Sequence, residues 1–429
     1  MGIDTAALAR RILWRLAVPT ILFMLLSSLD RSNVSFAALQ MNRELGFSPA
    51  QYGFGAGILF AGFLAGQYPS MLLLQRLGMR RWMAVSAVVW GLCALAMASL
   101  QGATQFYLLR VALGFAEGGL APGIVLYLSQ FATERERATT FALPMLAVPL
   151  SIVVGGPLSG WLMGMTLPGG LGGWRWMYVA EAVPAIVFGA QAWFYFPDGP
   201  EDAHWISDAE RRWLQANAAR SAGRRAGNDW SVLREPLVWL SALLWFCLLS
   251  GSYGIMFWLP QMLKRLADLS PLQVGVVNAL PFVGMAIGMY FNSAHSDRTG
   301  ERFLHVALPA AASALAIVGA YVSGAGPVGL LVLFIAGLTL GAAQGAFWSV
   351  PTTLLTPTTL AVAAVAINIC GSAGGLVMPT LVGLALTRTG SFAGPTLLVT
   401  GILLLAALLV MRIRATQLRA TRLATGRPP

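Results

Sequence analysis

Long apolar blocks alternate with short polar segments along the whole chain. Each block has about 20 residues, the length that an α-helix needs to cross about 30 Å of hydrocarbon. The pattern predicts twelve membrane-spanning helices, at residues 14–38, 52–74, 82–99, 104–128, 137–164, 176–196, 237–262, 273–292, 304–323, 327–350, 360–386 and 394–412. We interpret the first block as retained and not as a cleaved signal peptide, because it is long and eleven further blocks follow it.

The composition supports this interpretation. Of 429 residues, 57% are hydrophobic and 10% are charged, whereas a soluble domain carries about 25% charged residues. The net charge of +11 does not indicate a nucleic-acid partner, since the basic residues stand in short clusters between apolar blocks. The single lysine, Lys264, lies outside any P-loop motif, and the three histidines lack paired metal-ligand spacing. We therefore expect an all-α membrane protein without an ATP site, a metal or a cofactor.

The distribution of positive residues predicts the orientation. With both termini on the cytoplasmic side, the inner segments hold 21 of the 28 Arg and Lys residues and the outer segments hold five. Cytoplasmic loops of membrane proteins carry an excess of Lys and Arg. We expect both termini to be cytoplasmic and the chain to be a multi-pass protein of the bacterial inner membrane.

Two halves of the chain repeat one pattern. The basic motif of Arg76 and Arg80, after the second apolar block, recurs 222 residues further on at Arg298 and Arg302, after the eighth. Parallel repeats of this kind predict a substrate site near mid-membrane between the halves. We predict a six-helix bundle at 1–196, a cytoplasmic connecting loop at 197–235, and a six-helix bundle with a basic tail at 236–429.

Four charged side chains fall well inside the predicted spans: Asp30 and Arg31 in the first, and Arg110 and Glu117 in the fourth. Each charge costs about 2.5–3.5 kcal/mol on insertion and so indicates function by default. Helix geometry places Asp30 and Arg110 both about 9 Å from the outer boundary. Glu117 follows Arg110 by two turns on the same face. The structural alternative is a buried Arg110–Glu117 pair beside a polar packing patch at Asp30 and Arg31.

A further acid, Glu181, lies near the outer end of the sixth span. We expect it to pair with the interfacial Arg175 and to have a structural role.

Four segments carry a family resemblance: LDRSNVSFA at 29–37, RVALGFAEGG at 110–119, GWRW at 173–176 and HSDRTGER at 295–302. Together they resemble the major facilitator superfamily, and within it the anion:cation symporter family, over nearly the whole chain. The segments at 52–57 and 347–351 are similar to the branch that carries tartrate, phthalate and 4-hydroxyphenylacetate. The resemblance implies two pseudo-symmetric six-helix bundles and proton-coupled uptake of an organic anion by alternating access.

The charges and the resemblance suggest roles for individual residues. We expect Arg31 or Arg110 to receive the substrate carboxylate, because a guanidinium offers two donors and stays charged when desolvated. Asp30 and Glu117 are the expected proton-coupling carboxylates, and substrate arrival at an arginine would favour their protonation. Neutral side chains complete the predicted site: Phe63, Gln67, Tyr253, Gln261, Asn278, Gln344, Trp348, Asn368 and Ser372. Packing between helices is the alternative role for Tyr253, Gln261, Asn278, Gln344 and Ser372.

By resemblance, Trp348 and Asn368 match positions at which family members contact substrate, while Phe63 stands where relatives often have Tyr. The basic loop motifs suggest a cytoplasmic gate made of Arg76, Arg80, Asp297, Arg298 and Arg302. The alternative is that these charges only set the topology. The first motif has Gln75 where the superfamily often has Asp, so its gating contact is expected to be weaker or differently built.

These observations predict a monomeric secondary transporter that imports a small organic carboxylate with protons, using the proton gradient as its energy source. An exporter or antiporter of organic acids or drugs is the main alternative. A membrane-embedded enzyme is less favoured, because the spans contain no nucleophile–His pair or metal cluster. A receptor that binds without transporting is the remaining alternative.

Overall fold

The structure is a computed structural model that describes residues 4–131, 147–165, 173–223 and 230–425. Within these ranges every regular element is a helix. Eleven helices are long and apolar enough to cross a membrane, and a further apolar helix, α9 (Ala147–Met163), is shorter. The start of the span predicted at 137–164 lies outside the described residues. The protein is thus an all-α, multi-pass membrane protein, which confirms the predicted fold class.

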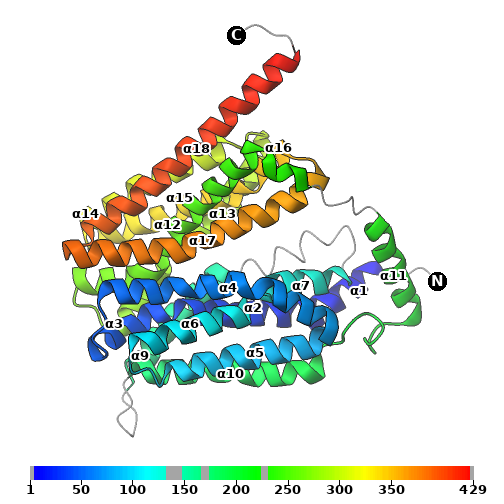
Figure 1. Cartoon of the computed structure of the whole chain (residues 1–429), viewed down its shortest axis with the longest axis horizontal. Helices are drawn as coiled ribbons and strands as arrows, with labels where there is room; N and C mark the ends of the chain where they lie inside the picture. The colour runs from blue at the N-terminus through cyan, green and yellow to red at the C-terminus, as the bar shows by residue number, and fades with distance from the viewer. Residues whose placement is uncertain (1–3, 132–146, 166–172, 224–229, 426–429) are drawn as a thin grey trace. The chain divides into compact units, whose positions relative to one another are not determined.

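The helices form two compact units. The first comprises Met1–Leu45 and Ile58–Arg225, and the second comprises Gly46–Gly57 and Ala226–Pro429. The division cuts through α4 (Pro49–Leu77), whose first turns group with the second unit. In Figure 1 the helices of the first unit run from blue to green, and those of the second run from green to red.

The first unit contains the N-terminal helices and the helix of the connecting segment. In chain order they are α1 (Thr5–Ile12), α2 (Val18–Ser32), α3 (Val34–Glu44), most of α4, α5 (Met79–Met97), α6 (Ala103–Glu117), α7 (Leu120–Ser129), α9, α10 (Gly173–Tyr195) and α11 (Asp208–Gly223).

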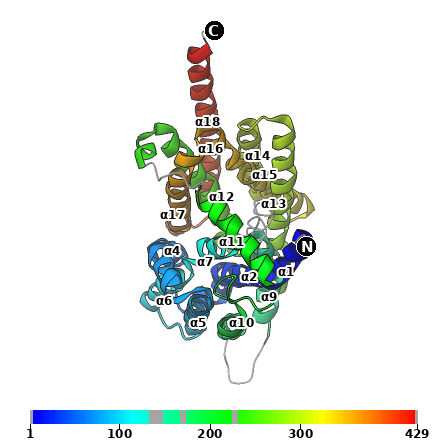
Figure 2. The same cartoon turned by 90° about the vertical axis from the view of Figure 1, so that its right-hand side faces the viewer.

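The first membrane span is longer than the hydrophobic pattern predicts. A π-helical turn at Leu13–Ala17 joins α1 to α2, and α3 continues after Asn33, so helix extends over Thr5–Glu44. The sequence predicts only 14–38, because hydropathy marks the length within hydrocarbon and not the polar turns beyond it. The same reason explains α18 (Ala393–Thr425), which continues well past the predicted end at residue 412; Figure 2 shows it extending beyond its neighbours in the second unit.

Glycines bring α4 and α6 into direct backbone contact. A Cβ on Gly114 would lie 2.0 Å from the carbonyl oxygen of Leu59, and one on Gly62 would lie 2.1 Å from that of Val111. Small residues at helix interfaces allow this close approach in membranes, where the hydrophobic effect does not drive helix association. The crossing fixes the register between Phe63 on α4 and Glu117 on α6.

Replacing Gly114 by Ala should therefore destabilise the protein. The added methyl group has backbone on the opposing side, so the helices must separate, at a cost of about 1–3 kcal/mol. Gly401→Ala is the matched control, because nothing lies within 4 Å of its Cβ position. Thermal unfolding of both variants in detergent measures the difference. Equal melting temperatures for the two variants would contradict the close crossing.

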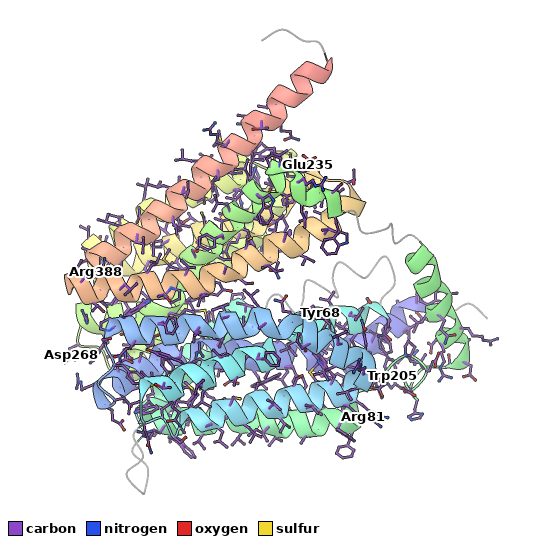
Figure 3. The ribbon with its side chains drawn as sticks, viewed as in Figure 1. Tyr68, Arg81, Trp205, Glu235, Asp268 and Arg388 are labelled. Carbon is purple, nitrogen blue, oxygen red and sulfur yellow. The ribbon has the colours of Figure 1, made fainter. Side chains whose placement is uncertain are left out.

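The second unit contains the remaining helices: α12 (Pro236–Leu266), α13 (Pro271–Thr299), α14 (Leu304–Ser323), α15 (Pro327–Phe347), α16 (Ser349–Leu354), α17 (Pro357–Thr389) and α18. Among these, α13 packs along α15, α14 packs on α15, and α12 packs on α17. Figure 3 shows Asp268 and Arg388 at one end of these helices and Glu235 at the other.

The glycine crossing recurs in the second unit. Gly284 and Gly288 on α13 stand 222 residues after Gly62 and Gly66, and a Cβ on Gly288 would lie 1.9 Å from the carbonyl oxygen of Leu338 on α15. The first turns of α4 are tied to α12, since the hydroxyl of Tyr52 donates a 2.8 Å hydrogen bond to the carbonyl oxygen of Phe257.

Candidate functional site: a buried polar cluster in the first unit

Among the described residues, four side chains of acids and arginines lie in the interior of the first unit. Asp30, Arg110, Glu117 and Glu181 have between 0% and 4% of their surface exposed. Asp30 comes from α2, Arg110 and Glu117 from α6, and Glu181 from α10. Three helices therefore place charge in one low-dielectric region, and such placement is costly unless the groups are paired, hydrogen-bonded or protonated.

Glu117 makes an ion pair with Arg31, whose Nη2 lies 3.2 Å from the carboxylate Oε2. The guanidinium of Arg31 also lies 5.0 Å from the ring centroid of Phe63 and 6.0 Å from that of Phe60. A cation over an aromatic face is attracted by the ring quadrupole. Arg31 thus lies between the carboxylate on α6 and the aromatic rings on α4.

The pair does not use all of its hydrogen-bonding capacity. Arg31 Nε and Glu117 Oε1 are buried and make no hydrogen bond to any described residue. A buried donor or acceptor without a partner costs about 1–3 kcal/mol. The arginine side chain is 16% exposed while that of Glu117 is fully buried. A carboxylate ligand can therefore reach the arginine first, and a proton can satisfy the free glutamate oxygen.

Arg110 shares the buried face of α6 with Gly114 and Glu117, as the sequence predicts. It lies close enough to Asp30 and Glu117 to interact with both electrostatically. The ion pair of Glu117, however, is made with Arg31. The structure therefore distinguishes two arginines: Arg31 at the accessible edge of the cluster and Arg110 in its interior.

Asp30 and Glu181 are joined by one amide side chain. Asn33 Nδ2 donates to Asp30 Oδ1 at 3.4 Å and to Glu181 Oε2 at 3.0 Å, and Ser159 Oγ donates to Glu181 Oε1 at 2.7 Å. Neither Asn33 nor Ser159 is among the residues that the sequence predicts for the site. The sequence signal for Asn33 is its spacing from Asp30, because a residue three positions further on lies on the same face of the helix.

The expected pairing of Glu181 with Arg175 is wrong. Arg175 binds Glu44 instead, at 2.7 Å, and donates to two backbone carbonyls near the end of α5. The buried residues of α10 include Trp174, Met177, Tyr178 and Glu181, a spacing typical of one inward helix face. Arg175 follows Trp174 by one position and so does not lie on this inward face. Its side chain reaches Glu44 instead.

The neutral residues predicted for the substrate site lie partly in each unit. Phe63 and Gln67 are one turn apart on α4, and both are half-buried. In the second unit, Gln344 is buried and donates to Ser252 Oγ at 2.6 Å and to the carbonyl oxygen of Leu248 at 3.1 Å. The NH₂ group of Gln344 therefore has both of its acceptors within the second unit.

Trp348 belongs to an aromatic cluster on α12 and α15. Trp245 stacks on Phe347 with a centroid distance of 4.4 Å and contacts Trp348 at 5.8 Å. Trp245 is not among the residues that the sequence predicts for the site. Gly371 on α17 allows this indole to approach, because a Cβ there would lie 2.2 Å from it.

The other predicted residues of the second unit are dispersed. Tyr253 stacks on Phe257 at 6.3 Å, and Asn278 is buried with an Oδ1 that has no partner among the described residues. Gln261 is half-buried. On α17, Ser372 is buried whereas Asn368, one turn earlier, is exposed.

The first loop motif pairs with Asp198, an acid in the segment after α10, and not with an acid of the motif itself. Asp198 Oδ2 lies 3.0 Å from Arg80 Nε, and Asp198 Oδ1 accepts the backbone N–H of Arg80 at 3.0 Å. Gly78 adopts a φ of 78°, and a Cβ there would lie 2.5 Å from the Asp198 carboxylate. Asp198 thus supplies the carboxylate that the motif lacks at Gln75, and it also caps the start of α5.

Replacing Asp198 by Ala should lower stability by about 0.5–2 kcal/mol, the usual cost of losing a helix cap. The exposed ion pair adds little to this figure. Asp202→Ala, a few residues away on the exposed surface, should stay within about 0.5 kcal/mol of the wild type. Thermal unfolding of both variants checks the expectation, and an unchanged melting temperature for Asp198→Ala would show that the cap is not needed.

The second loop motif has its own acid. Asp297 makes an ion pair with Arg302, whose guanidinium also donates to Ser296 Oγ at 3.2 Å. Gly300 ends α13 in the left-handed conformation. Arg76 and Arg298, the other members of the predicted gate, are exposed.

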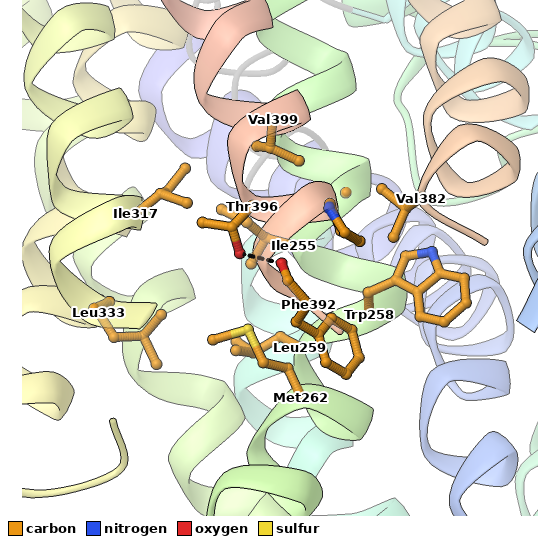
Figure 4. Close-up of a pocket in the computed structure, with 13 residues that line it drawn as sticks. Ile255, Trp258, Leu259, Met262, Ile317, Leu333, Val382, Phe392, Thr396 and Val399 are labelled. Carbon is orange, nitrogen blue, oxygen red and sulfur yellow. Dashed lines mark hydrogen bonds between the residues drawn. The ribbon is translucent and has the colours of Figure 1, made fainter. Parts of the chain in front are cut away.

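An apolar pocket of about 60 Å³ lies within the second unit, between α12, α14, α15, α17 and α18. Its lining includes Trp258, Leu259, Met262, Ile317, Phe392 and Val399, and no charged side chain (Figure 4). The hydroxyl of Thr396 donates a 2.7 Å hydrogen bond to the carbonyl oxygen of Phe392. This pocket offers no partner for a carboxylate, and none of the predicted site residues lines it.

The fold and the buried charges define a class of protein, and comparisons with known proteins agree on it. The model of the Major Facilitator Superfamily matches residues 20–379, so the chain belongs to this superfamily of transporters, which are not enzymes. A bacterial homologue of the lysosomal transporter Spinster has a similar structure, with a TM-score of 0.74 at 17% identity over 95% of this chain and 96% of that one.

Full-length relatives narrow the class to transporters of the anion:cation symporter type. An Agrobacterium vitis protein named "Putative tartrate transporter" is 40% identical over 413 residues, 95% of this chain and 94% of its own. The inner membrane transport protein RhmT of Escherichia coli is 33% identical (91% and 92% covered), and a quinolone resistance transporter of Acinetobacter baumannii is 31% identical (90% and 89% covered).

Proposed function

We propose that the protein imports a small organic carboxylate, of the tartrate, phthalate or hydroxyphenylacetate type, together with protons. The observation that supports this most directly is the buried Arg31–Glu117 pair beside Phe63. A guanidinium binds a carboxylate through two parallel hydrogen bonds. The full-length similarity to the Agrobacterium vitis proteins named for tartrate favours a small hydroxylated or aromatic acid.

The proposed coupling is an exchange of partners at Arg31. In the structure Arg31 neutralises Glu117. When a substrate carboxylate takes the guanidinium, Glu117 loses its counter-charge in a buried environment, and an ionised carboxylate there is costly. Proton binding to Glu117 removes this cost. Substrate and proton therefore favour each other's binding, which is the linkage that symport requires.

Asp30 is the second proposed proton-binding carboxylate, and Arg110 stabilises whichever of the two acids is ionised. In the second unit, Gln344, Trp348, Asn368 and the other neutral residues are proposed to recognise the rest of the substrate. The loop motifs of Arg76, Arg80, Asp297, Arg298 and Arg302 are proposed to act as the cytoplasmic gate. The two six-helix halves would then open the site alternately to each side of the membrane.

Uptake into proteoliposomes tests this proposal. Labelled tartrate, phthalate and 4-hydroxyphenylacetate are offered to the purified protein with an inward, an absent or an outward proton gradient. We expect at least one acid to accumulate with the inward gradient only, and not in liposomes lacking the protein. If all of these acids equilibrate without accumulating, proton symport of this substrate class is wrong.

Export is the second candidate function, and the similarity to the quinolone resistance transporter favours it. The same proteoliposomes distinguish the two directions. Export coupled to proton influx predicts that an inward proton gradient expels a preloaded quinolone or organic acid. Import predicts that the same gradient retains it.

A further inference from the structure

Glu181 is a buried acid that the proposed mechanism leaves without a role. Only 4% of its surface is exposed, and among the described residues no Arg, Lys or His nitrogen lies within ion-pair distance of its carboxylate. Burial of an ionised carboxylate without a counter-ion costs several kcal/mol, so such a group takes up a proton readily.

The surroundings of Glu181 fit both of its protonation states. When it is ionised, Ser159 and Asn33 donate one hydrogen bond to each carboxylate oxygen. When it is protonated, its O–H can donate to Ser159 Oγ, because a serine hydroxyl within a helix can turn to the carbonyl one turn earlier. A site that satisfies both states is suited to binding and releasing a proton.

Asn33 connects this site to Asp30. The two hydrogens of its single NH₂ group serve Asp30 Oδ1 and Glu181 Oε2. Two carboxylates held this close in a low-dielectric interior repel each other when both are ionised. Asp30 Oδ2 and the Tyr178 hydroxyl are buried and have no hydrogen-bond partner in the described part of the chain. Either oxygen can therefore accept a hydrogen bond from a carboxyl proton on Asp30 or Glu181.

The remaining charges around the pair come from α6. Arg110 and Glu117 act on Asp30 electrostatically, and Arg110 also acts on Tyr178 from α10. Arg110 stabilises one negative charge in this region, whereas Asp30, Glu117 and Glu181 would together carry three. The charge balance therefore favours protons on the acids, with Arg31 compensating Glu117.

We propose that Glu181 is an additional proton-binding residue of the transport cycle, coupled to Asp30 through Asn33. The inference rests on the proposed proton symport and extends it. Substrate binding at Arg31 would change the charge of Glu117, and this would change the electrostatic potential at Asp30. Glu181 would take up or release a proton in response. Neutral Glu181 allows Asp30 to be ionised, and ionised Glu181 favours protonated Asp30.

Infrared spectroscopy tests the pair without any substrate. The difference spectrum of the purified protein in lipid, between acidic and alkaline pH, records the C=O stretch of protonated carboxyl groups. We expect Glu181→Gln to lose one component of this band. We also expect the Asp30 component, identified by its loss in Asp30→Asn, to titrate at a pH about one unit lower, because the neighbouring negative charge is gone.

Two further variants separate coupling from a structural role. Asn33→Ala removes the donor that the two carboxylates share, so the Asp30 and the Glu181 components should both move. Ser159→Ala removes a donor from Glu181 only and should alter the Glu181 component more than the Asp30 component. If Glu181→Gln leaves the band unchanged, or only lowers the yield of folded protein, Glu181 is not a proton-binding residue.

Uptake measurements then connect the pair to transport. We expect the midpoint of the pH profile of uptake in Glu181→Gln to shift by about one unit in the same direction as the infrared band, with substrate exchange retained. An infrared shift without an uptake shift would mean that Glu181 binds a proton outside the cycle and would overturn the inference. Absent uptake in the wild type contradicts symport itself, and the infrared result is independent of it.

Discussion

Replacing Glu117 by Gln should abolish gradient-driven accumulation of the substrate while leaving substrate exchange largely intact. Glutamine keeps an oxygen that can accept a hydrogen bond from Arg31, so the contact at 3.2 Å survives in neutral form. It cannot bind and release a proton. For each net positive charge carried inward, about 100 mV supplies about 2.3 kcal/mol, or about 50-fold accumulation. This accumulation should fall to about onefold.

The measurement compares net uptake with counterflow exchange in the same proteoliposomes. Asp268→Asn is the matched control, because this acid is fully exposed in the loop between α12 and α13 and the change is chemically the same. Its accumulation should equal that of the wild type. Accumulation by Glu117→Gln at the wild-type level would remove Glu117 from the coupling mechanism.

Replacing Arg31 by Lys should weaken substrate binding although the charge is kept. Lysine has no planar fork, so it cannot donate two parallel hydrogen bonds to a carboxylate. It also lacks the flat cation that lies 5.0 Å from the Phe63 ring. Loss of one hydrogen bond to a charged group costs about 1.5–3 kcal/mol, which corresponds to about a 10- to 150-fold weaker affinity.

Isothermal titration of the substrate identified in the uptake screen measures this change. Arg388→Lys, at an exposed position near the end of α17, serves as the control and should bind like the wild type. The same substitution at Arg110 distinguishes the two arginines. Because Arg110 is fully buried, we expect its replacement to alter the coupling between the acids more than the affinity. Wild-type affinity in Arg31→Lys would mean that the carboxylate binds elsewhere.

Much of the fold was predictable because hydrocarbon imposes a simple rule on sequence. A helix must be about 20 residues long and apolar to span the bilayer, so the apolar blocks marked the spans directly. The helix ends were less predictable. Thr5–Ile12 and the end of α18 are polar or basic, and nothing in their hydropathy distinguishes a helix that continues beyond the membrane from a loop.

The charged residues of the candidate site were equally visible, because Asp30, Arg31, Arg110 and Glu117 are rare residue types within apolar spans. Their partners were not. Which arginine meets Glu117 depends on the rotation of α2 against α6, and that rotation is set by packing. The pairing of Glu181 shows the same limit, since Asn33 and Ser159 are far from it in sequence and are ordinary polar residues.

The acid that holds the first loop motif could not be found by its position within that motif. Asp198 lies more than a hundred residues after Arg80, and only the return of the chain at the end of α10 brings the two together. A missing residue in a local motif can therefore be replaced by one from a distant part of the chain.

The most direct test of the central claim is the movement of protons with the substrate. Proteoliposomes without an imposed gradient are given substrate outside, and the external pH is recorded in weak buffer. We expect the external medium to become more alkaline with wild-type protein, and we expect Glu117→Gln to give no such change while it still exchanges labelled substrate. Substrate uptake by the wild-type protein without any external alkalinisation would contradict proton symport.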